Sequence, residues 1–111
     1  MRMLSEIVAS LTPEKKAFVI GSAFVDMVIN VHEMPHAGAD VEGEYRKTVV
    51  GGCSFNVADV LHKLGLPFES YMPVGEGEFS RIVERALTER GYPVYRETGA
   101  GDNGWCLSIA D

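Results

Sequence analysis

The stretch VVGGCSFNVADVLHKLG, residues 49–65, decides the fold class of this chain. It begins with β-branched residues, breaks at Gly51 and Gly52, and then places apolar residues at the spacing of one helix face over 57–64. Gly65 follows, and glycine is the residue type that most often ends a helix. A strand that leads directly into a helix is the repeating unit of α/β proteins, so this stretch predicts that architecture.

The residues on either side continue the alternation of strand and helix. The run AFVIG at 17–21 is apolar and closed by glycine, which favours a strand buried on both faces of a parallel sheet. Downstream, the sequence predicts a strand over 68–74, an amphipathic helix from Phe79 that Gly91 ends, and a strand near 92–95. The alternation predicts a mainly parallel sheet.

Three further segments have the pattern of strands. Residues 25–31 are apolar and rich in β-branched types, 41–50 interleave polar residues, and 105–110 alternate large apolar residues with small or polar ones. Ahead of all of these, residues 1–16 predict a helical N-terminal extension. The chain stops at Asp111 directly after a strand, with no closing helix, so we expect it to be part of a longer protein.

The composition suits one soluble globular domain, because 46% of the 111 residues are hydrophobic and 23% are charged. The formal net charge of −6 disfavours a nucleic-acid partner. No apolar run approaches the roughly 20 residues that a membrane span needs, and Glu6 interrupts the region where a signal peptide would be apolar. We therefore expect a cytoplasmic protein with no membrane partner.

Cys53 and Cys106 are expected to be free thiols, and the histidines lack metal-ligand spacing.

The turn from strand to helix at 49–56 is the first candidate binding site. Two glycines let a ligand approach the backbone closely, and the N–H groups of the first helical turn have no partner within the helix. Asn56 adds an amide that can both donate to and accept from a hydroxyl group. The alternative is a turn that needs glycine only for its backbone angles, and the spacing alone leaves both interpretations open.

Asp26 is the second candidate. It comes directly after the first predicted core strand, and ligands of open α/β sheets bind outside the carboxyl ends of the strands. An ionised carboxylate accepts hydrogen bonds from two hydroxyl groups. The alternative is a solvated acid in a loop, which is where most lone aspartates lie.

Several motifs in a fixed order resemble those of one family. They are GSAFVDM at 21–27, a loop with Met34, Pro35 and Gly38, GGCSFNVADVLHKLG at 51–65, and VGEGEFSRIVERALTERGYPV at 74–94. Together they resemble the N-terminal part of the PfkB, or ribokinase-like, carbohydrate kinases. The resemblance covers residues 18–111.

The resemblance implies an ATP- and Mg²⁺-dependent kinase that phosphorylates a hydroxymethyl group of a sugar or nucleoside. It implies a doubly wound sheet over 17–111 with a small β lid, whose strands would lie near 25–31, 41–50 and 104–110. The residues implied to bind substrate are Asp26, Gly51, Gly52, Cys53 and Asn56. Because such lids pair two subunits in several members, a homodimer through the lid is also implied.

The strand at 105–110 bears on the lid and on the dimer. Its alternation places Trp105, Leu107 and Ile109 on one face and small or polar residues on the other. We expect the small face to look toward the substrate, which places Cys106 at the site. An exposed apolar face is an association surface, so we expect a partner subunit to cover the large face.

Three features limit or modify what the resemblance implies. Phe24 and Cys53 stand where ribokinases have asparagine and lysine, which favours a substrate with an apolar or planar part, such as a nucleoside or a deoxygenated sugar. The string GAGD at 99–102 resembles the second signature of the family, but Asn103 and a strand follow it where a helix should begin, so we expect a turn. The catalytic base and the ATP and Mg²⁺ sites are therefore expected outside this chain, which alone should not catalyse.

Two functions remain open from the sequence. The first is the substrate-binding and lid portion of a PfkB-type kinase, and the ordered motifs favour it. The second is a non-catalytic α/β dimerisation or interaction module.

Overall fold

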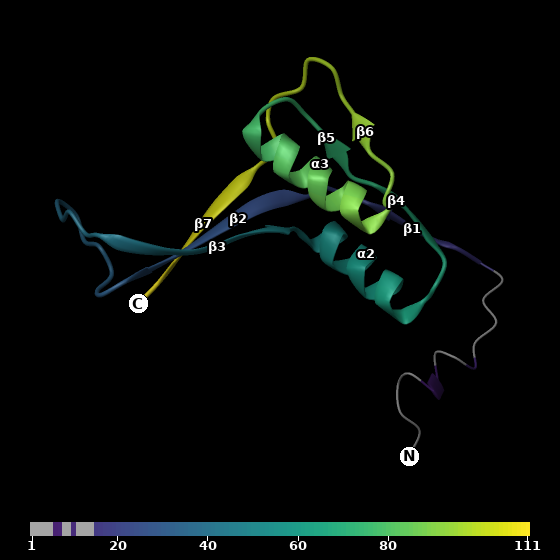
Figure 1. Cartoon of the computed structure of the whole chain (residues 1–111), viewed down its shortest axis with the longest axis horizontal. Helices are drawn as coiled ribbons and strands as arrows, with labels where there is room; N and C mark the ends of the chain where they lie inside the picture. Colours follow the sequence, from purple (N-terminus) through teal and green to yellow (C-terminus); the bar gives the residue numbers. More distant parts are fainter. Residues whose placement is uncertain (1–5, 8–9, 11–14) are drawn as a thin grey trace.

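The computed structural model describes residues 6, 7, 10 and 15–111, in which helices α2 and α3 are each preceded and followed by two or three strands, not by the single strands that strict alternation predicts (Figure 1). The elements in chain order are β1 (Ala17–Ile20), β2 (Phe24–Val31), β3 (Gly43–Gly51), α2 (Cys53–Leu64), β4 (Phe68–Tyr71), β5 (Pro73–Val74), α3 (Glu78–Arg90), β6 (Tyr95–Arg96) and β7 (Trp105–Ala110).

The strands form three small groups. β1 pairs with β4 and β5 pairs with β6, both in parallel. A three-stranded sheet has the order β3-β2-β7, with β2 and β3 antiparallel and β2 and β7 parallel. Figure 1 shows both helices near β1, β4 and β5, while the far ends of β2, β3 and β7 extend away from the helices. The three segments predicted as lid strands therefore share one sheet.

The core lies where the helices meet the strands. Both helices bury one apolar face, as their amphipathic patterns predict. Strands β2 and β5 and the segments around them supply the other side of the core. Its buried members are Ala23, Val25, Phe55, Ala58, Met72, Val74, Val83, Leu87 and Tyr92.

Both helices end where the sequence predicts, and for the expected reason. Gly65 and Gly91 adopt left-handed backbone conformations, with φ of 71° and 77°, which other residue types adopt only at a cost. Their N–H groups donate back to the last turn, to the carbonyl oxygens of His62 at 3.1 Å and of Thr88 at 3.0 Å.

The expectation that the AFVIG strand is buried on both faces is wrong for the described residues. Val19 is 8% exposed, but Phe18 and Ile20 are 61% and 68% exposed. Within the part of the chain that the structure describes, one face of β1 is covered, and α2 is the helix that contacts it. The apolar composition of a strand does not show whether other described residues bury both of its faces or only one.

Other boundaries also differ from the prediction. The strand expected over 68–74 is interrupted at Met72, so β4 pairs with β1 while β5 pairs with β6. β6 begins at Tyr95 because Tyr92 packs into the core instead. Of the predicted extension over 1–16, Glu6 and Ile7 are helical, and most of it lies outside the described residues.

Candidate functional site

The register of the three-stranded sheet gathers most of the predicted site residues at one end. Phe24 pairs with Gly51, and Asp26 lies between Val49 on β3 and Cys106 on β7. Residues that pair across strands share a face of the sheet, so the Asp26 carboxylate and the Cys106 thiol are on the same side. The sheet thus brings together residues that are about 80 positions apart in the chain.

Asp26 is a strand residue. The turn between β1 and β2 is short, so β2 has already begun at Phe24, and the alternative of a solvated loop acid is wrong in this respect. Its side chain is half-buried, and Ser108 Oγ donates a hydrogen bond to Asp26 Oδ1 at 2.9 Å. This bond orients the carboxylate and leaves Oδ2 able to accept from another donor.

The two glycines of the turn differ in what the backbone requires. Gly52 has a φ of 105°, and a Cβ there would lie 2.6 Å from the Ser22 carbonyl oxygen. The same Cβ would lie 3.3 Å from Cδ1 of Phe24, so the Phe24 ring rests against the Gly52 backbone. At Gly51 the nearest atom to an added Cβ is 4.0 Å away. Gly52 is therefore required by chain geometry, whereas Gly51 has room for a small side chain.

Helix α2 begins directly after this turn. Its N-cap is Gly52, which has no side chain to cap the helix, and its first turn contains no acidic residue. Cys53 and Asn56 are both exposed in the first turn and a half of the helix. The Asn56 backbone N–H donates to the Gly52 carbonyl oxygen at 3.0 Å, while the Asn56 amide makes no hydrogen bond with the other described residues. The helix start is thus open to a polar ligand.

The GAGD string caps a helix elsewhere in the chain. Residues 99–104 are irregular, as expected, and Asp102 reaches the start of α3. Asp102 Oδ1 accepts from Ser80 N at 2.6 Å and from Ser80 Oγ at 2.5 Å, and Oδ2 accepts from Phe79 N at 3.2 Å. The Ser80 hydroxyl, followed by the backbone N–H groups, holds the pKa of Asp102 below its ordinary value. This carboxylate supplies the cap that Gly77, the residue at the N-cap position of α3, cannot supply.

Asn103 extends the same loop toward the site. Its Nδ2 donates to the carbonyl oxygens of Ala23 at 3.0 Å and Pro73 at 3.3 Å, and its Oδ1 accepts from Gly75 N at 3.0 Å. The loop therefore ties the start of β2 to β5 and α3. Sequence reasoning missed this role. The available signal was the glycine at the start of α3, which leaves that helix without a local side-chain cap.

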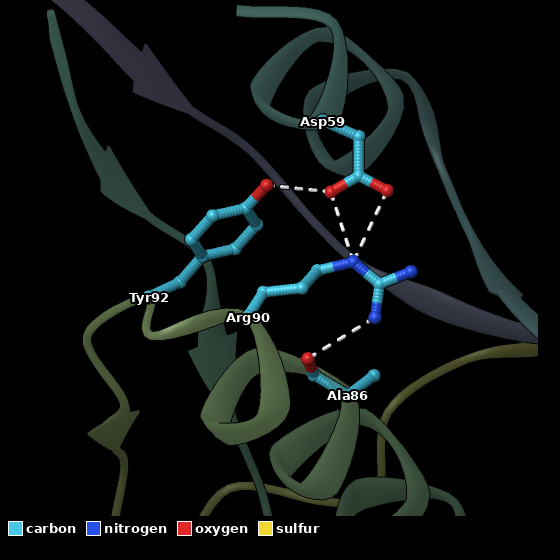
Figure 2. A network of polar contacts seen from close by, with 4 residues as sticks. All are labelled: Asp59, Ala86, Arg90 and Tyr92. Atoms are coloured by element: carbon cyan, nitrogen blue, oxygen red, sulfur yellow. Dashed lines mark hydrogen bonds and ion pairs between the residues drawn. The ribbon is translucent and has the colours of Figure 1, made fainter. Parts of the chain in front are cut away.

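A polar network fixes the two helices relative to each other (Figure 2). Arg90 Nε donates to both carboxylate oxygens of Asp59, at 2.9 and 3.1 Å, and Tyr92 OH donates to Asp59 Oδ1 at 2.6 Å. Arg90 also lies over the Phe55 ring, 4.7 Å from its centroid. Burial, followed by the hydrogen bond to Asp59, raises the pKa of Tyr92, so the phenol stays protonated.

Both cysteines are free thiols, as the sequence predicts, and both are exposed. Within the described part of the chain, no three His, Cys, Asp or Glu side chains gather as metal ligands would, so the described residues do not fit a Mg²⁺ site. None of the helices described in this chain is long and apolar enough to cross a bilayer.

A family model described as pfkB family carbohydrate kinase matches residues 14–111. The chain belongs to the pfkB family of carbohydrate kinases. It is 29% identical over 108 residues to an uncharacterized sugar kinase, YegV, of Escherichia coli K12, covering 97% of this chain and 34% of that protein.

Two solved kinase structures have the same fold over most of this chain. A carbohydrate kinase from Agrobacterium tumefaciens matches with a TM-score of 0.67 and 25% identity, over 86% of this chain and 31% of that one. The ribokinase from Giardia lamblia matches with a TM-score of 0.71 and 23% identity, over 85% of this chain and 31% of that one. The predicted ribokinase-like α/β fold is thereby confirmed, and the chain spans about a third of the length of these relatives.

Proposed function

We propose that this chain is the substrate-binding and lid portion of an ATP-dependent pfkB-family kinase that phosphorylates a hydroxymethyl group of a sugar or nucleoside. The observation that carries the proposal is the Asp26 carboxylate. It is half-buried, oriented by Ser108, and shares a sheet face with the end of β3 that leads into the open start of α2. A fixed carboxylate with one free oxygen suits a ligand that offers hydroxyl groups.

Each predicted site residue has a role in this proposal. Asp26 accepts hydrogen bonds from substrate hydroxyls, and the Asn56 amide pairs with another hydroxyl. Gly51 and Gly52 let the substrate approach the backbone at the start of α2, where Cys53 and, from the sheet, Cys106 border it. ATP and Mg²⁺ would bind in parts of the family fold beyond the third that this chain matches, so the chain alone binds substrate without transferring phosphate.

A binding measurement on the 111-residue chain tests the Asp26 assignment. Asp26→Ala should weaken the binding of the sugar or nucleoside by about 1.5 to 3 kcal/mol, the typical contribution of a charged hydrogen bond. Titration calorimetry with a panel of sugars and nucleosides would measure the change, and circular dichroism would confirm that the variant folds. Asp40→Ala removes an exposed acid outside the site and should leave affinity unchanged. Equal affinity in folded Asp26→Ala and in the unsubstituted chain would contradict the assignment.

A homodimer through the three-stranded sheet is the second part of the proposal. Tyr45, Leu107 and Ile109 are exposed large apolar side chains on this sheet, and a surface of that kind favours association. Trp105, on the same face, is 56% exposed although it also stacks on Phe79 of α3 with ring centroids 5.9 Å apart. The surface for a second copy therefore includes Trp105 together with Leu107 and Ile109. The alternative of an interaction module with no ligand of its own predicts the same association without sugar binding.

A further inference from the structure

A hollow of about 320 Å³ lies at the junction of the β1–β2 turn with β7, next to Asp26 along the sheet. Its lining is Ser22, Ala23, Phe24, Gly104, Trp105 and Cys106. The volume is at the lower end of the roughly 300 to 1,000 Å³ of small-molecule pockets, so it has room for one ring. No charged side chain lines it, although the adjacent strand position carries the Asp26 carboxylate.

Gly104 lines the hollow with backbone alone. Gly104 precedes β7, and its carbonyl oxygen accepts from Val25 N at 3.0 Å, which fixes it beside the start of β2. A Cβ built on Gly104 would lie 3.8 Å from Cβ of Phe24, so a side chain at position 104 would lie against Phe24, which also lines the hollow.

The walls of the hollow are held in place from outside it. The Phe24 ring rests against Gly52, where the backbone tolerates only glycine. Trp105 is held by its stacking on Phe79. An aromatic wall, a thiol and an open glycine backbone make an apolar surface that is formed before any ligand binds, and such preformed apolar pockets take apolar or aromatic groups.

We propose that this hollow binds an apolar or planar group attached to the hydroxylated part of the substrate, with Phe24 as the residue that selects for it. The inference rests on the proposed function, because Asp26 takes the hydroxylated part while the Phe24 ring packs on the attached group. The preferred substrate class is therefore a sugar that carries an aryl group or a heterocyclic base, rather than the same sugar without it.

Cysteine labelling separates this inference from the proposed function. Cys106 borders the hollow, and Cys53 lies in the first turn of α2 beside the sugar site. The 111-residue chain is alkylated with iodoacetamide, and peptide mass spectrometry measures the labelling rate of each cysteine. The rates are compared within two pairs of ligands, each a bare sugar and a related substituted one. The pairs are D-ribose with uridine, and D-glucose with phenyl β-D-glucoside. Within at least one pair, both ligands should slow Cys53 labelling to a similar extent, whereas the substituted ligand should slow Cys106 labelling more than its parent sugar does. That ligand should also bind about tenfold more tightly than its parent sugar.

Two glycine variants provide a matched pair. Gly104 has a φ outside the left-handed region, so Gly104→Val places a side chain in the hollow without that backbone strain. This variant should abolish the tenfold preference for the substituted ligand and leave the affinity for the bare sugar unchanged. Gly101→Val adds the same side chain to the same loop, where a Cβ meets no heavy atom within 4 Å, and it should keep the preference. Phe24→Leu should reduce the preference without filling the hollow.

The outcomes distinguish the two proposals. One outcome is that every sugar slows Cys53 labelling while bare and substituted ligands leave Cys106 labelling equal. That result would overturn the hollow as a binding site and leave the proposed function standing. A Gly104→Val chain that weakens both ligands of a pair equally would also overturn it. Protection of neither cysteine by any ligand would overturn the proposed function, and with it this inference.

Discussion

At the scale of single residues, the two neighbouring glycines of the strand-to-helix turn are not equivalent. Gly52 combines a positive φ with a carbonyl oxygen that a Cβ would meet at 2.6 Å, whereas Gly51 has ordinary angles and a neighbour no closer than 4.0 Å. The sequence left open whether these glycines serve a ligand or only the backbone angles of the turn, and the answer differs between the two residues. Backbone geometry requires glycine at position 52 whether or not a ligand binds there, whereas no described neighbour requires it at position 51, where a bound ligand would explain it.

This difference predicts unequal costs of substitution. Gly52→Ala should lower the free energy of unfolding by about 1 to 3 kcal/mol, because alanine would be strained there and would press on the Ser22 carbonyl. Gly51→Ala should cost far less stability. Urea denaturation followed by circular dichroism measures both variants. Equal losses in the two would show that the turn differs from the one described.

Asp102 provides the second residue-scale prediction, and it concerns pH. Its pKa in the folded chain lies below the ordinary 3.8, so the unfolded state binds the proton more tightly. The stability that Asp102 contributes is therefore fully present at neutral pH and is lost as the pH falls below about 4 toward the lowered pKa. Asp102→Asn should be less stable than the unsubstituted chain at pH 7.

The same variant should also show a flatter loss of stability between about pH 5 and pH 2, because asparagine does not titrate. Urea midpoints measured at several pH values would test this. Two curves that remain parallel through this range would mean that Asp102 does not titrate as described. Asp40→Asn, which neutralises an exposed acid outside the cap, is the matched control.

At the scale of secondary-structure elements, the contact of α2 with α3 depends on a single buried tyrosine and an ion pair. Tyr92 is 6% exposed, its hydroxyl donates to Asp59 on α2, and its ring meets those of Phe55, His62 and Phe68 edge-on. Arg90 on α3 pairs with the same carboxylate. Helix α2, whose first turn borders the candidate site, also contacts β1, β3 and β4, and this network adds a polar tie to α3.

Removing the phenol hydroxyl should therefore weaken the contact without emptying the core. Tyr92→Phe should lower the free energy of unfolding by about 0.5 to 1.5 kcal/mol, because Asp59 would lose one hydrogen bond and keep its arginine. Tyr95→Phe, in an exposed tyrosine whose ring contacts Tyr71, should change stability little. Denaturant titration compares the two variants, and an unchanged midpoint in Tyr92→Phe would contradict the role of this bond.

At the scale of the whole molecule, the described residues leave apolar side chains exposed on two groups of strands. One such surface is the face of β1 that carries Phe18 and Ile20, and the other is the apolar face of the three-stranded sheet with Leu107 and Ile109. Relatives of about three times this length have the same fold, so in them further chain is available to cover the strands that correspond to β1. The second surface is where the proposed homodimer forms.

Sedimentation equilibrium at micromolar concentration tests the dimer. The unsubstituted chain should sediment as a dimer, and Ile109→Glu should sediment as a monomer, because a buried unpaired carboxylate is costly at an interface. Ile109 avoids the stacking that a change at Trp105 would disturb. Val60→Glu, on an exposed valine of α2, should leave the dimer intact. A monomer in the unsubstituted chain, or a dimer that survives Ile109→Glu, would rule out this interface.

Local chemistry determined much of this protein. Helix α2 with its glycine start and stop, helix α3, the strand character of 24–31 and 105–110, and the membership of the pfkB family all follow from short-range patterns in the sequence. These features depend on backbone angles and on hydrophobic periodicity, which neighbouring residues specify by themselves.

Only the tertiary structure decided which distant residues meet. Ser108 orients Asp26, Asp102 caps α3, and Phe24 rests against Gly52, and in each case the partners are 22 or more positions apart in the sequence. The same is true of β1, whose apolar run predicts burial on both faces, whereas the described residues cover one face and leave Phe18 and Ile20 exposed. A local sequence pattern indicates whether a residue can be buried or can form a hydrogen bond. Which residue it then contacts depends on strand register and on where the chain turns back, and no local pattern specifies these.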